Sequence, residues 1–252
     1  MKIRHPYKED IPQLKSLWKE AFSDTDEYID AFFCTAYIGD RCLIAEENGI
    51  VGMLYWFDAS YFDTPIAYFY AIATKASHRG RGVCRALMSE AHKHLKGLGY
   101  TAAMLVPGEK GLFDFYKKLG YDISTYIDTF ECHRAEGNIE IRETNGEEYG
   151  ALRRKYLPKN SVIQESESIK YLEKQAKLYT GKDFLLACRV NADTLFGIEL
   201  LGNKENAPLI LAALDCKKGV FRTPGGKAPF SMYYPLKNHT LPPIFYLGLA
   251  FD

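Results

Sequence analysis

The sequence has few features of a metal-binding, secreted or membrane-embedded protein. Its six cysteines form no Cys-x-x-Cys pair and have no spacing typical of a metal-ligand set. It has no long apolar run, and its opening residues, MKIRHPYKED, include no apolar signal region. We therefore expect a cytoplasmic protein with free thiols, no bound metal and no contact with membranes.

The sequence also has no excess of charge of either sign. Lysine plus arginine and aspartate plus glutamate both number 32 among 252 residues, so the formal net charge is zero. A protein that coats nucleic acid needs a basic surface, so we expect no nucleic-acid partner. Any affinity for an anion must come from a local site.

Histidine is sparse, with six residues that include one close pair, His92 and His94. Because these two residues are two positions apart on a predicted helix, their side chains point to different faces. They do not suit a shared metal ion, and we expect both to be solvated.

Two pairs of segments suggest that the chain contains a repeat. IRHPYKEDIPQLKSLW from Ile3 and IRETNGEEYGALRRKY from Ile141 share an Ile-Arg pair, a following acidic pair, and Leu and an aromatic residue at equal offsets. YIGDRCLIAEENGIVGMLY from Tyr37 and YTGKDFLLACRVNADTLFGIEL from Tyr179 both predict a strand, a polar turn and a second strand. The matched order favours a duplicated unit over independent strand–turn–strand patterns, although both interpretations stay open.

The predicted elements indicate an α+β fold with mixed strand directions. Hydrophobic residues make up 47% of the chain, enough for two small domains. We place the boundary near Ala135–Asn138, where RAEGN is polar, and expect domains at 1–135 and 136–252. The last predicted strand is 244–251.

The segment SHRGRGVCRALM, residues 77–88, combines two glycines with two arginines at the start of an amphipathic helix predicted over 82–97. Unpaired N–H groups and the helix dipole favour an anion at such a position, and glycine lets the main chain approach it. The segment predicts a diphosphate held by the main-chain amides of Arg79–Cys84. Neither a P-loop nor a dinucleotide fingerprint fits, because Gly-Lys-Ser/Thr and the third glycine are missing.

ATKASHRGRGVCRALM resembles the acetyl-CoA signature of the GNAT superfamily of N-acetyltransferases, R/Q-x-x-G-x-G/A, with Arg79 first and Gly82 fourth. Cys84 stands where the family usually has Gly or Ala. TAAMLVPGEKGLFDFYKKLGY resembles the family's following strand and helix, with Tyr116 at the position of the family tyrosine. The second half is most similar to the two-lobed, enhanced-intracellular-survival type, in which the second lobe has the same fold without a cofactor site.

The resemblance implies two tandem GNAT lobes, of which the second is degenerate. It further implies transfer of an acetyl group from acetyl-CoA to a primary amine of a small-molecule or peptide acceptor, by direct attack in a ternary complex. The main chain near Ile72–Thr74 would stabilise the oxyanion. The implied cofactor-binding residues are Ile72, Ala73, Thr74, Arg79, Gly80, Arg81, Gly82, Val83 and Cys84.

The catalytic side chains are less evident. The motif implies that Tyr116 protonates the departing CoA thiolate, and the alternative is a packed core ring. The candidates for the general base that deprotonates the amine are Asp58, Asp63 and Asp128. A further hypothesis, suggested by the two-lobed relatives, is that the carboxylate of Asp252 enters the active site; the alternative is a plain edge strand.

Two other functions stay open. The first is a non-catalytic acyl-CoA-binding sensor or scaffold, which the unidentified base and Cys84 favour. The second is an acyltransferase that uses a longer acyl-CoA or another acceptor atom. Exposed strand edges could also pair between chains to give a homo-oligomer.

Overall fold

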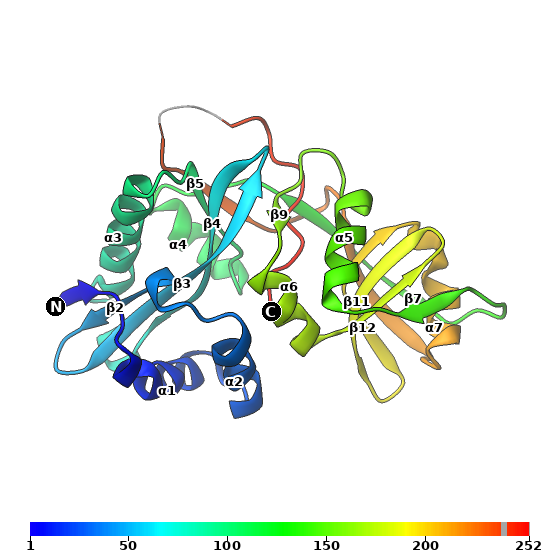
Figure 1. Cartoon of the computed structure of the whole chain (residues 1–252), viewed down its shortest axis with the longest axis horizontal. Coiled ribbons are helices and arrows are strands. Elements are labelled where there is room, and N and C mark those ends of the chain that lie inside the picture. Colours follow the sequence, from blue (N-terminus) through cyan, green and yellow to red (C-terminus); the bar gives the residue numbers. More distant parts are fainter. Residues whose placement is uncertain (238–240, 252) are drawn as a thin grey trace. The chain divides into compact units, whose positions relative to one another are not determined.

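The computed structural model describes residues 1–237 and 241–251. It divides into two compact units, each with its own sheet (Figure 1). Unit 1 comprises Met1–Asp122 and Met232–Leu241, and unit 2 comprises Ile123–Ser231 and Pro242–Asp252. The division therefore falls earlier than the expected boundary near Ala135–Asn138, because the strand before that boundary pairs within the sheet of unit 2.

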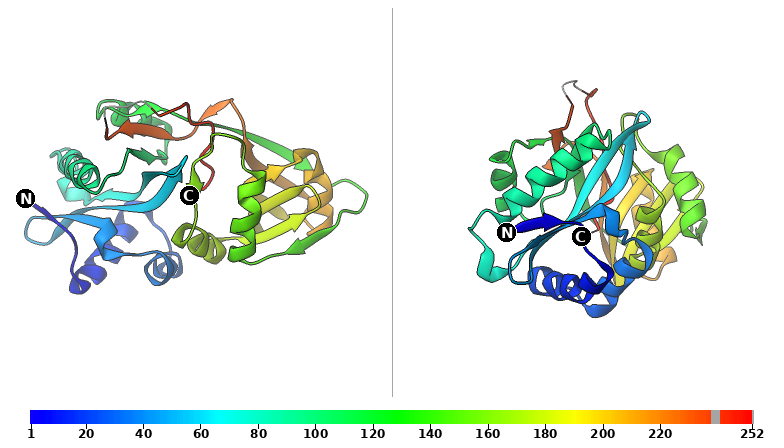
Figure 2. Two further views of the ribbon diagram at one scale, coloured as in Figure 1. Left: turned by 45° about the horizontal axis from the view of Figure 1, so that its top comes forward. Right: turned by 60° about the vertical axis from the view of Figure 1, so that its left-hand side comes forward.

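Unit 1 is a mixed sheet with helices on both faces (Figure 2). Its strands lie in the order β1-β2-β3-β4-β5-β15, with β6 at the edge where the chain passes to unit 2. The pair β4–β5 is parallel. The strands are β1 (Lys2–Arg4), β2 (Cys42–Glu46), β3 (Ile50–Tyr61), β4 (Thr64–Thr74), β5 (Ala102–Leu105), β6 (Asp122–Ile123) and β15 (Met232–Pro235), and the helices are α1 (Ile11–Phe22), α2 (Asp26–Thr35), α3 (Val83–Gly97) and α4 (Lys110–Lys117).

The aromatic residues of β4 face alternate sides of this sheet, as the two-residue period of a strand requires. Tyr70 packs against Trp18 of α1, with ring centroids 5.4 Å apart. Phe69 stacks on His92 of α3, with centroids 5.8 Å apart. Helices α1 and α3 thus cover opposite faces of β4.

Unit 2 is a second mixed sheet, in the order β14-β7-β13-β12-β11-β10-β8. Its core gathers buried side chains of β11, β12, β13 and α7, among them Leu186 and Phe221. The elements are β7 (Tyr126–His133), β8 (Ile141–Glu143), β9 (Ile163–Gln164), β10 (Lys177–Gly181), β11 (Phe184–Asn191), β12 (Thr194–Gly202), β13 (Lys218–Pro224), β14 (Ala228–Pro229), α5 (Gly146–Tyr156), α6 (Glu167–Gln175) and α7 (Ala207–Ala213).

The two units repeat one topology. The succession β1-α1-α2-β2-β3-β4-α3-β5 corresponds to β8-α5-α6-β10-β11-β12-α7-β13, with the same order within the sheet and one parallel pair, β4–β5 or β12–β13. The segments from Ile3 and Ile141 fall on equivalent elements. The segments from Tyr37 and Tyr179 are one strand out of step, because they align β2 and β3 with β11 and β12, whereas the order within the sheets makes β10 and β11 their equivalents.

The predicted strand 244–251 is wrong. These residues run in an irregular path within unit 2, with a single bridge between Ser161 and Tyr246. The side chain of Gln164 donates to the carbonyl of Leu249 at 2.7 Å and accepts from its N–H at 3.1 Å. Main-chain bonds add to this, from Val162 N to Tyr246 O and from Phe245 N to Asn160 O, both at 2.8 Å. Scattered contacts rather than a continuous ladder therefore hold the segment. In the described part of the chain, no helix is long and apolar enough to span a bilayer.

Candidate active site

The strand β4 departs from regular pairing at two points close together. Its parallel register with β5 joins Ile66–Phe69 to Ala102–Leu105. Directly after that, Leu54 of β3 faces two residues of β4, Ala71 and Ile72, in a β-bulge where Ala71 has a φ of 50°. Pairing with β5 therefore stops at Phe69, where β5 ends, while β4 continues to Thr74; we call this point the fork. The bulge just beyond it redirects the main chain of Ile72–Thr74. No feature of the sequence signals this bulge.

The glycine loop follows β4 and leads into α3. Gly80 and Gly82 have φ values of 74° and 81°, and a Cβ on either would meet no atom within 4 Å. Gly82 is the N-cap of α3 and supplies no side-chain cap. Among the described residues, the N–H groups from Gly80 to Arg85 have no acceptor, and the first helical bond runs from Ala86 N to Gly82 O. The loop thus presents a row of free donors beside open space.

This loop also carries unpaired positive charge. Between Lys75 and Arg85 the sequence has four Lys and Arg residues and no Asp or Glu. None of the four forms an ion pair with a described residue, although Arg79 Nε donates to the carbonyl of Thr74 at 3.3 Å. In a chain of zero net charge, this local excess favours an anion.

Tyr116 lies on α4 with 7% of its surface exposed. Its hydroxyl has no hydrogen-bond partner among the described residues, and burial raises the pKa of its phenol, with a smaller contribution from nearby Cys84. Burial also raises the pKa of the Cys84 thiol to about 11. Tyr116 is therefore a neutral phenol that interacts electrostatically with Cys84, in the first turn of α3.

The carboxylates considered as bases lie elsewhere. Asp58 pairs with Arg41 at 2.5 Å and accepts from Tyr100. Asp63 lies in the turn between β3 and β4, at the opposite end of β4 from the loop. Asp128 belongs to unit 2, where it accepts from the N–H of Gly226 at 3.0 Å. Asp252 is outside the described residues.

His92 corrects the expectation of a solvated side chain. Its ring lies 4.0 Å from that of Tyr234 at an interplanar angle of 11°, and Nε2 is 2.7 Å from the hydroxyl of Tyr121. Burial lowers the pKa of His92 to about 4. The described residues contain no group of three or more His, Cys, Asp or Glu that could hold a metal ion.

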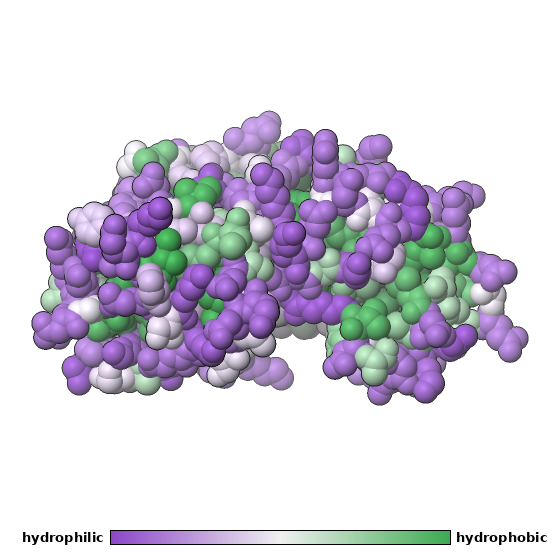
Figure 3. Space-filling view, turned by 60° about the horizontal axis from the view of Figure 1, so that its bottom comes forward, coloured by the Kyte–Doolittle hydropathy of each residue, from purple (hydrophilic) through white to green (hydrophobic). Residues whose placement is uncertain are grey.

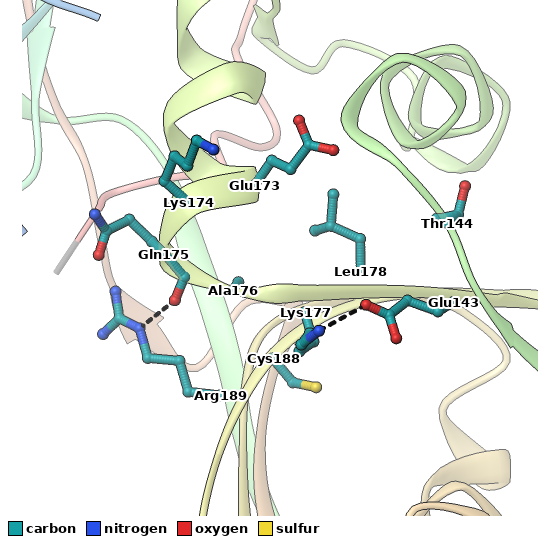
Figure 4. Close-up of a pocket in the computed structure, with 10 residues that line it drawn as sticks. All are labelled: Glu143, Thr144, Glu173, Lys174, Gln175, Ala176, Lys177, Leu178, Cys188 and Arg189. Carbon is teal, nitrogen blue, oxygen red and sulfur yellow. Dashed lines mark hydrogen bonds and ion pairs between the residues drawn. The ribbon is translucent and has the colours of Figure 1, made fainter. Parts of the chain in front are cut away.

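A pocket of about 340 Å³ in unit 2 offers a contrast (Figure 4). Lys177 there pairs with Glu143 at 2.8 Å, and Arg189 Nε donates to the carbonyl of Gln175 at 3.0 Å. Lys174 also lines this pocket, but so do the carboxylates of Glu143 and Glu173. The pocket therefore lacks the unopposed positive charge of the glycine loop.

A family model described as an acetyltransferase (GNAT) domain matches residues 2–124. Residues 2–124 are a GNAT domain. The matched segment contains the bulged strand, the glycine loop and Tyr116. No curated protein matches the sequence.

Solved structures resemble the whole chain. A GCN5-related N-acetyltransferase from Anabaena variabilis has a TM-score of 0.74 at 13% identity, over 94% of this chain and 73% of that one. A probable N-acyltransferase from Enterococcus faecalis has a TM-score of 0.71 at 15% identity, over 93% and 72%. Eis1 from Mycobacterium abscessus has a TM-score of 0.65 at 16% identity, over 91% and 66%. The chain therefore has the two-lobed GNAT fold that the sequence predicted.

Proposed function

We propose that the protein is an acetyl-CoA-dependent N-acetyltransferase with one active lobe, unit 1. The observation that carries the proposal is the start of α3, where free amides and unpaired cations adjoin a bulged and forked β4. The diphosphate of acetyl-CoA would bind the main chain of Gly80–Cys84, with Arg79 and Arg81 adding charge-assisted donors. Open space at Gly80 and Gly82 leaves room for that approach.

Acyl transfer then needs three proton or charge movements. The amine nitrogen loses a proton and attacks the thioester carbon. A main-chain N–H of Ile72–Thr74, redirected by the bulge, would stabilise the oxyanion. The carbon–sulfur bond breaks, and the CoA thiolate takes a proton from Tyr116. The base stays unassigned, and the carboxylate of Asp252 remains a hypothesis.

The role of Tyr116 has a direct test. Tyr116→Phe should lower kcat about tenfold, a typical share for one proton donor, while the dissociation constant of acetyl-CoA stays within twofold. Steady-state kinetics and calorimetry measure the two quantities. Unchanged turnover would remove Tyr116 from the mechanism.

Release of free CoA thiol, measured against a panel of small-molecule and peptide amines with acetyl-CoA and longer thioesters, tests the function itself. Acetyl transfer to an amine supports the proposal. Preference for a longer thioester would indicate a different acyltransferase. Tight CoA binding without turnover on any amine would favour a sensor or scaffold.

Unit 2 would act as a lobe without a cofactor site, and self-association remains a proposal. Apolar side chains gather in the right-hand part of Figure 3, which belongs to unit 2. Val190 and Phe196 of unit 2 are 47% and 46% exposed. Sedimentation of the full chain would show whether this surface pairs two copies.

A further inference from the structure

A buried polar contact lies behind Tyr116, on the side of unit 1 that α3 covers. Tyr121 follows α4, is 1% exposed, and its ring meets that of Tyr116 with centroids 6.0 Å apart and an interplanar angle of 61°. The main chain supports the same contact, because Tyr121 N donates to Tyr116 O at 3.1 Å. The position of Tyr121 therefore limits where the Tyr116 ring can lie.

The hydroxyl of Tyr121 is in turn fixed by His92 of α3, at 2.7 Å from Nε2. The imidazole lies nearly parallel to the rings of Tyr234, at 4.0 Å, and Phe69, at 5.8 Å. Phe69 is the last residue of β4 that pairs with β5, so it marks the point where the fork opens. A continuous set of packed rings and one hydrogen bond thus joins the fork to α4.

This arrangement matters because the two ends of the set have different tasks in the proposed reaction. The fork would hold the thioester, and Tyr116 would protonate its sulfur. A hydroxyl displaced by about 1 Å loses much of its catalytic effect, and Tyr116 has no hydrogen bond of its own among the described residues to prevent this. Ring packing restrains it instead: Phe115, its neighbour on α4, lies at a centroid distance of 5.2 Å, and Tyr121 is the contact that links Tyr116 to α3.

We propose that Tyr121 and His92 are positioning residues that fix the place of Tyr116 relative to the fork in β4. This inference rests on the proposed function. They act through Tyr116 and do not contact the reacting atoms. Loss of the hydrogen bond between them should therefore affect the step that needs Tyr116 and leave binding of acetyl-CoA intact.

Kinetics of the full-length protein test this. Tyr121→Phe and His92→Phe keep the rings and remove the hydrogen bond. Each should lower kcat about fivefold, with KM for acetyl-CoA within twofold. In a Tyr116→Phe background neither should lower kcat further, because the residue they position has lost its hydroxyl. His94→Phe is the matched control, since His94 on the same helix packs on His5 and Trp56 instead, and kcat should not change.

Three results would each overturn the proposal. They are an unchanged kcat in Tyr121→Phe, a rise of KM for acetyl-CoA as large as the fall of kcat, and a further fivefold fall of kcat in the Tyr116→Phe background. If the wild type transfers no acyl group, the proposed function fails, and the contact is tested separately. Fluorotyrosine at position 116 should then give one sharp fluorine resonance in the wild type and a broadened or shifted one in His92→Phe. An unchanged resonance would show that His92 does not restrain Tyr116. Thermal unfolding of each variant identifies any that fails to fold.

Discussion

The two units build the same strand–helix–parallel strand connection, yet the segments that lead into the helix differ in composition and local contacts. In unit 1, Gly82 caps α3 without a side chain, and the preceding loop is rich in arginine. In unit 2, α7 has Pro208 in its first turn, and the side chain of Asn203 accepts from Glu205 N at 3.2 Å. Asp183 adds a negative charge, accepting from Asn206 Nδ2 at 2.6 Å. We therefore propose that the same topology offers an anion site in unit 1 and not in unit 2.

The two bulged strands, β4 and β12, also differ in the side chains that surround the bulge. In unit 2 the parallel pairing of β12 with β13 ends at Gly197, and Glu199 follows directly after the bulged residue, Ile198. Arg153 donates to this carboxylate at 2.7 and 2.9 Å, and the hydroxyls of Tyr149 and Tyr246 donate to it as well. A Cβ on Gly248 would lie 1.9 Å from Glu199 Oε1. In unit 2 the main-chain bulge thus lies beside a buried, fully paired charge, whereas the bulge of β4 in unit 1 leads toward a loop of free amides and unpaired cations.

The largest expected effect is a loss of stability on disrupting the buried ion pair between Arg153 and Glu199 in unit 2. Arg153→Met leaves the fully buried Glu199 without its charge partner, which should lower the free energy of unfolding by about 3–5 kcal/mol. Denaturant unfolding measures this. Arg154→Met is the matched control: its ion pair with Glu165 is exposed, so the loss should stay below about 1 kcal/mol. Equal losses in the two variants would show that the buried pair has no special weight.

Closing the open helix start of unit 1 comes next. In Gly82→Val, a branched side chain would enter the space before α3 at a φ of 81°. It should weaken acetyl-CoA binding about 100-fold, on the order of 2.7 kcal/mol. Gly99→Val controls for backbone strain, because Gly99 lies beyond the other end of α3 with a φ of 91° and equally open space. Calorimetric titration should find normal affinity in the control; weak binding in both variants would trace the effect to strain.

The third comparison concerns how the stability of unit 1 depends on pH. The pKa of His92 in unit 1 is lowered to about 4, below the ordinary value of about 6.5. The unfolded chain therefore takes up a proton first as the pH falls, and unit 1 should lose on the order of 2 kcal/mol between pH 6.5 and 4.5. Hydrogen exchange followed by mass spectrometry should show β4 and α3 losing protection in that range. His92→Phe has no titrating group at position 92, so its loss of stability over this pH range should be smaller. An identical pH profile in the variant would show that His92 is not the cause.

Local patterns predicted much of unit 1. The apolar spacing in residues 82–97 and the glycines before it indicated both the position of α3 and its open start, because capping chemistry is written in neighbouring residues. The bulge at Ala71 could not be predicted, since it depends on how β3 pairs with β4. Strand β10 was missed when the two segments were matched, because it is defined by its pairing with β8 and β11 rather than by local propensity. His92 was misplaced because its partners come from β4, β15 and the chain after α4.

The smallest expected effect is on acetyl-CoA affinity when a loop arginine is removed. Its size distinguishes main-chain amides from arginine side chains as the main donors. If main-chain amides do most of the binding in unit 1, Arg81→Ala should weaken acetyl-CoA binding only about threefold, as for one partly solvated charge. Lys204→Ala, before α7 of unit 2, should leave affinity unchanged, because Lys204 lies outside the proposed site in unit 1. A loss in Arg81→Ala as large as that in Gly82→Val would transfer the main role from the backbone to the side chain. The difference between the units would then be one of charge rather than of open amides.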